Sequence, residues 1–63
     1  MHPDSAQLTS ITSAIDDLTE RVTAIADRHA GTHDELVAGA LYEVERNLQA
    51  AARRLSAVIR DLG

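Results

Sequence analysis

Two uninterrupted heptad patterns fill most of the chain and constrain its fold more than any other feature. Apolar positions are spaced alternately three and four residues apart, first over residues 8–29 and again over residues 37–62. This average spacing of 3.5 residues is typical of helices that pack along a shared seam, and it predicts an all-α fold. The two sets are Leu8, Ile11, Ile15, Leu18, Val22, Ile25 and His29, and then Val37, Leu41, Val44, Leu48, Ala51, Leu55, Val58 and Leu62.

The residues between the two patterns favour a turn. Gly31 stands where a left-handed residue would end the first helix, and Thr32 with Glu35 fits the capping box that opens a second one. We therefore expect a single domain made of a coiled-coil-like antiparallel two-helix hairpin. Its first helix spans about residues 5–29, the turn residues 30–32 and the second helix residues 33–61, after a flexible N-terminus at residues 1–4.

One continuous helix is the alternative to the hairpin. Ile25, His29, His33 and Val37 are spaced in fours, as in a stutter within an unbroken coiled coil. A single interior glycine costs only about 1 kcal/mol in such a helix. The continuous rod would be about 85 Å long, given the helical rise of 1.5 Å per residue.

The register of the two patterns is consistent with a hairpin. If each heptad position a meets a position d of the other helix, seven apolar layers share one offset, centred on a turn near residue 33. The expected pairs are Leu8/Val58, Ile11/Leu55, Ile15/Ala51, Leu18/Leu48, Val22/Val44, Ile25/Leu41 and His29/Val37.

The small size of the chain predicts self-association. A chain of 63 residues buries a marginal core, and without cysteine it has no disulfide to reinforce that core. We expect a homodimer in which two hairpins form a four-helix bundle through a flank of small and apolar residues. That flank is Thr12, Thr19, Ala26, Ala38, Tyr42, Ala52 and Ile59.

Charge gives one candidate surface for another partner. The net charge of −4 does not favour nucleic acid as the main partner. However, Arg46, Arg53 and Arg60 follow one another at seven-residue intervals on an outward-facing position, so they predict a basic ridge for phosphate groups or an acidic protein. A solvated face without a ligand is the simpler interpretation.

Little in the sequence points to chemistry. His29 and His33 are the candidate metal ligands, but two ligands without a third make a weak site, so capping and polar filling at the turn are the expected roles. Asp16, Asp17 and Glu20 form an acidic cluster without a nucleophile or pocket. We expect no enzyme activity, no catalytic residue, no metal and no cofactor.

The sequence also bears on localisation. The N-terminus has no basic region followed by an apolar stretch, and no segment reaches the roughly 18 consecutive apolar residues of a membrane span. A cytoplasmic protein without a membrane partner is expected.

The expected function is that of a self-associating assembly or regulatory module for protein–protein interaction. In length and layout the expected bundle resembles the small plasmid-encoded Rop-type bundle, which pairs two hairpins and binds RNA. The resemblance is one of architecture and carries over no binding residue. It implies, as one alternative, a nucleic-acid-binding bundle that uses the arginine ridge. A second alternative is a small subunit completed by a different protein in a larger complex.

Overall fold

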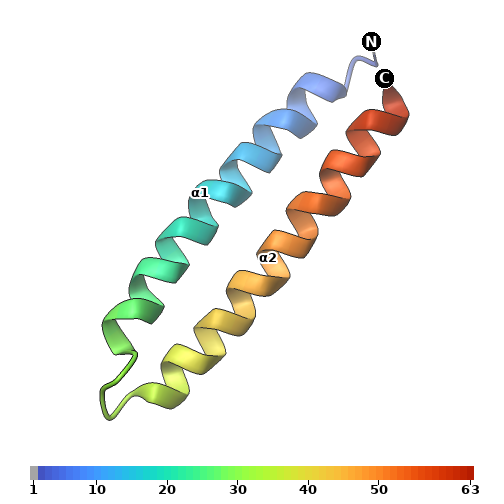
Figure 1. Cartoon of the computed structure of the whole chain (residues 1–63). Coiled ribbons are helices and arrows are strands. Elements are labelled where there is room, and N and C mark those ends of the chain that lie inside the picture. Colours follow the sequence, from blue (N-terminus) through green and yellow to red (C-terminus); the bar gives the residue numbers. More distant parts are fainter. Residues whose placement is uncertain (1) are drawn as a thin grey trace.

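The computed structural model, which describes residues 2–63, is a helical hairpin (Figure 1). Helix α1 spans Ser5–His29 and helix α2 spans Glu35–Leu62, and no strand occurs within these described residues. The helices lie side by side and antiparallel over a length of about 50 Å, with the start of α1 next to the end of α2. The predicted all-α hairpin is thus confirmed, and the continuous helix is wrong.

The turn follows from Gly31 and Thr32. Gly31 has a φ of +79°, the left-handed conformation that the sequence predicted there. The Thr32 hydroxyl donates to the His29 carbonyl at 2.6 Å and accepts from the Asp34 N–H at 3.0 Å. Because Thr32 is used to close the turn, it does not cap α2, which begins at Glu35, two residues later than predicted.

The N-terminal residues form a turn before α1. The His2 carbonyl accepts a hydrogen bond from the Ser5 N–H at 3.0 Å, and His2 Nδ1 accepts one from the Asp4 N–H at 3.1 Å. We expected residues 1–4 to be flexible. Residues 2–4 adopt this hydrogen-bonded turn and Met1 lies outside the described residues, so the flexibility of this segment stays a prediction.

Helix α1 contains threonines, which are weak helix formers, and it accommodates them through local hydrogen bonds. Whereas the buried Ser5 hydroxyl at the start of α1 has no partner among the described residues, each of these threonine hydroxyls donates to the carbonyl four residues earlier. This allows Thr19 to lie buried in the contact with α2. The four bonds join Thr9 to Ser5, Thr12 to Leu8, Thr19 to Ile15 and Thr23 to Thr19, at 2.7–3.0 Å.

The two helices meet through small side chains at heptad position e. Thr19 and Ala26 of α1 and Ala38 and Ala52 of α2 are buried, and Ala26 is completely inaccessible to solvent. Small residues in this row allow the two backbones to approach closely. The large residues at position a lie half-buried beside this row; they are Leu8, Ile15, Val22, Leu41, Leu48, Leu55 and Leu62.

The seven predicted layers are therefore wrong in their packing. We expected positions a and d to share the centre of the seam, but the d positions of both helices lie outside it. The apolar stripe on each helix covers a, d and e, which is wider than the seam between two helices. The e edge of each stripe packs against the other helix of the hairpin, whereas within residues 2–63 the d edge has no helix packed against it. The alignment along the axis agrees with the prediction to within one turn, since Thr23 contacts Glu45.

Candidate interaction surfaces

The side chains left outside the seam form what we call the apolar face. With the seam at position e, the d positions of two antiparallel helices fall on the same side of the hairpin, next to the half-buried a positions. Their side chains remain 39–47% exposed although all are large and aliphatic. The exposed members are Ile11, Leu18 and Ile25 of α1 and Val37, Val44 and Val58 of α2.

The apolar face is unusual for a chain of this size. Single exposed aliphatic residues are normal on protein surfaces, whereas contiguous apolar patches mark interaction sites. Here the exposed residues recur every seven positions on α1, and on α2 they recur at the same spacing with Ala51 between Val44 and Val58, so the patch follows the hairpin from the turn to the open end. The charged side chains of the chain lie at other heptad positions. This surface is suited to packing against further helices.

The residues predicted as the self-association flank lie elsewhere than expected. Most of them are in the seam between α1 and α2 of a single chain, where a second hairpin cannot reach them. The physical reason is their small size, which makes them the preferred line of contact within the hairpin. The buried members are Thr19, Ala26, Ala38 and Ala52, and the half-buried ones are Thr12, Tyr42 and Ile59.

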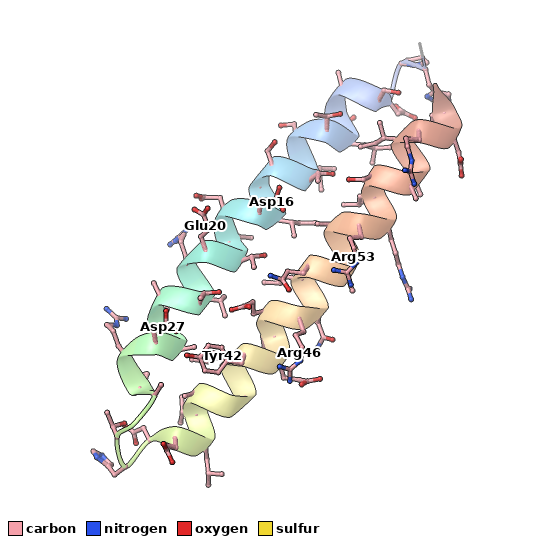
Figure 2. The ribbon with its side chains drawn as sticks, in the orientation of Figure 1. Asp16, Glu20, Asp27, Tyr42, Arg46 and Arg53 are labelled. Atoms are coloured by element: carbon pink, nitrogen blue, oxygen red, sulfur yellow. The ribbon has the colours of Figure 1, made fainter. Side chains whose placement is uncertain are left out.

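The side of the hairpin opposite the apolar face is polar, and hydrogen bonds join the helices there. The Tyr42 hydroxyl donates to Asp27 Oδ1 at 2.5 Å, and Glu45 Oε2 is a second acceptor for the Thr23 hydroxyl, whose one proton is shared with the Thr19 carbonyl. Figure 2 shows Tyr42 directed from α2 toward Asp27 on α1. The hydrogen bond to Asp27 raises the pKa of Tyr42 above its usual value of 10.0, because it stabilises the protonated phenol.

The three arginines of the predicted ridge differ in their contacts. Arg46 forms an ion pair with Glu43 one turn earlier on α2, and Figure 2 shows it directed away from α1. Arg53 and Arg60 are exposed and form no salt bridge within residues 2–63. Only these two of the three ridge residues therefore have guanidinium groups free for a partner.

Arg53 and Arg60 border a groove between the helices, which we call the open-end groove. Its volume is about 780 Å³. Figure 2 shows Asp16 of α1 and Arg53 of α2 at the same level of the hairpin. Sequence reasoning missed this groove, although its signal was present: position b carries polar residues on both helices and lies on the far side of the seam from d. The lining residues are Thr12, Asp16, Gln49, Ala52, Arg53, Ser56 and Arg60.

The two candidate metal ligands lie at the turn beside one carboxylate. His29 Nδ1 is 3.4 Å from Asp34 Oδ2, and His33 Nε2 is 3.5 Å from Asp34 Oδ1. Across residues 2–63 no group of three or more histidine, cysteine or acidic side chains is arranged to hold a metal ion. The histidines instead supply polar contacts around the start of α2.

Neither α1 nor α2 is both long and apolar enough to cross a membrane. Comparison with known proteins gave no match to this chain from a protein-family model, a curated protein or a solved structure.

Proposed function

We propose that this chain is a small, non-enzymatic interaction module of the cytoplasm that self-associates through its apolar face. In this proposal two hairpins pack face to face into a homodimeric four-helix bundle, and the assembled bundle serves an assembly or regulatory role. The observation that carries the proposal is the row of large aliphatic d side chains left exposed on both helices. In a four-helix bundle each helix contacts two neighbours, which uses both edges of an apolar stripe that spans a, d and e.

The energetics support association. Complete burial of a large aliphatic side chain contributes about 1.5–3 kcal/mol, so covering the exposed fraction of the six d residues contributes about 4–8 kcal/mol per chain. Two chains contribute about twice that amount. The loss of translational and rotational freedom on association is of the same size, about 4–15 kcal/mol. Burial of the half-exposed a residues adds further stabilisation, which favours the dimer.

A second copy of the chain fits this face by symmetry. An isologous interface requires one surface that is complementary to itself. The apolar face meets this requirement, since like-charged side chains would not be brought together when two copies of it meet.

The test is the concentration dependence of mass in sedimentation equilibrium for the wild type and two lysine variants. Leu18→Lys places a charge in the middle of the apolar face, whereas Ser13→Lys places the same charge at an exposed position outside it. We expect a dimer for the wild type and for Ser13→Lys. For Leu18→Lys we expect dimerisation at least about 100-fold weaker, because each dimer would bury two ammonium groups.

Two outcomes would contradict self-association. One is a wild-type chain that stays monomeric at millimolar concentration, and the other is a Leu18→Lys variant that dimerises as well as the wild type. A monomeric wild type that binds a hydrophobic dye would instead favour the alternative that a different protein covers the apolar face.

A further inference from the structure

We infer that the open-end groove is a binding site for a helical protein segment that carries two carboxylates seven residues apart. The groove lies on the polar side of the hairpin, away from the apolar face. It therefore stays accessible whether or not two hairpins associate, and the inference does not rest on the proposed dimer. The partner class follows from the charges, the shape and the polar lining of the groove, which we take in turn.

The charges define two anchor points. Arg53 and Arg60 lie on the same side of α2, two helical turns apart, which is about 10 Å along the axis. Both line the groove without a salt bridge in the described part of the chain, whereas Arg46 is paired with Glu43. Acidic residues at positions i and i+7 of a docked helix have the same spacing, and guanidinium groups bind carboxylates with two parallel hydrogen bonds.

The shape of the groove suits a third helix. Ala52, which is buried, and Thr12, which is half-buried, form a floor of small side chains between α1 and α2. The lining of α2 extends from Gln49 to Arg60, a distance of about 16 Å or three helical turns. Toward the turn, the Tyr42–Asp27 hydrogen bond joins the helices on the same side of the hairpin. The groove thus matches a short helical segment rather than a long one.

The remaining lining distinguishes a peptide from a nucleic acid. Asp16 lines the groove from α1 at the level of Arg53, and its carboxylate disfavours a uniformly anionic chain such as a nucleic acid, whereas a peptide can offer it a basic side chain. Ser56 and Gln49 add neutral donors and acceptors. Aromatic side chains are the main platforms for stacking nucleic-acid bases, and Tyr42, the one Phe, Tyr or Trp of the chain, is engaged with Asp27. An acidic segment that also carries one basic residue therefore complements this groove best.

The experiment is an NMR titration of the isotope-labelled full chain with a designed probe. The probe is an alanine-rich peptide of about 20 residues, long enough to be partly helical in water, with two glutamates seven residues apart and one lysine between them. We expect amide shifts confined to the groove, at residues 49–60 of α2 and around Thr12 and Asp16 of α1. A matched peptide with glutamine in place of both glutamates should bind about tenfold more weakly.

Variants of the chain separate this site from other surfaces. Arg53→Gln and Arg60→Gln should each weaken binding about threefold to tenfold, while the matched variant Arg46→Gln should leave it unchanged. Leu18→Lys, which tests the apolar face, should also bind the probe as the wild type does. If Leu18→Lys no longer dimerises but still binds the peptide, the result supports the binding site in the open-end groove. It also shows that this site is independent of the dimer.

Three results would overturn the assignment. The first is the absence of groove shifts at millimolar probe, and the second is equal binding of the glutamate and glutamine peptides. The third is a single-stranded oligonucleotide that shifts the same amides at a lower concentration than the peptide. That result would assign the groove to nucleic acid and favour the arginine-ridge alternative.

Discussion

Gly39 offers a direct test of how the two helices are formed. It lies inside α2, and a Cβ atom built at this position would meet no atom within 4 Å beyond its chain neighbours and the adjacent backbone of its own helix. Replacing it with alanine therefore adds no steric conflict and removes the conformational entropy that glycine loses in a helix. We expect Gly39→Ala to raise the free energy of unfolding by about 0.5–1 kcal/mol. For a domain of this size, about 1 kcal/mol raises the Tm by about 4–8 °C.

Gly31 provides the matched control, because the same substitution should have the opposite sign there. A Cβ at Gly31 also meets no atom within 4 Å, so space does not decide the outcome. The backbone conformation decides it, because Gly31 has a φ of +79° and an L-residue in this left-handed region costs about 1–2 kcal/mol of conformational energy. We expect Gly31→Ala to lower the free energy of unfolding by about 1 kcal/mol, which leaves the two variants about 2 kcal/mol apart.

The assay is urea unfolding followed by circular dichroism at one fixed protein concentration, since self-association would make stability depend on concentration. The wild type and both variants are compared by their midpoints at a common slope. If both alanine variants were stabilised equally, Gly31 would occupy an ordinary helical conformation in solution. The chain would then be a continuous helix, and the reasoning from the hairpin would fail.

Two further predictions concern the seam and the polar side of the hairpin. Ala26→Leu should destabilise the fold by about 1–3 kcal/mol, because a larger side chain at this fully buried position forces the helices apart. The control Ala24→Leu, at an exposed position, should change stability by less than about 0.5 kcal/mol. Urea unfolding midpoints measure both variants, and equal effects would place Ala26 outside the seam. Asp27→Asn should lower the pKa of Tyr42 toward 10, measured by ultraviolet absorbance titration, because the carboxylate that holds the phenol protonated is removed. Because the pKa of Tyr42 is raised in the folded wild type, this hydrogen bond stabilises the fold below about pH 10, and its contribution is lost as the pH rises through the pKa of Tyr42. A free energy of unfolding that does not change between about pH 9 and 12 would contradict the contact.

The helices and the turn could be predicted from the sequence because local signals agreed. The heptad spacing gave both helices, the bounds of α1 were predicted as observed, and Gly31 was correctly assigned the left-handed conformation. The start of α2 was placed two residues early, because the capping pattern from Thr32 to Glu35 does not reveal that the Thr32 hydroxyl is used within the turn.

The orientation of the helices about their own axes could not be predicted from the same pattern. The heptad rule for two-stranded coiled coils places a and d in the seam, but that rule assumes only one neighbour per helix. The small residues Ala26, Ala38 and Ala52 offered a closer line of contact, which rotated both helices and exposed the d positions. The choice between two edges of one apolar stripe depends on packing across the helices, which spacing along the chain does not report.

The position of the helix ends has a practical consequence for protein engineering. Because α1 starts beside the end of α2, the two ends of the hairpin lie close together. A segment with this geometry can be grafted into a surface loop of an unrelated host without stretching either junction. It would project from the host as a rigid arm, with the turn at its far tip.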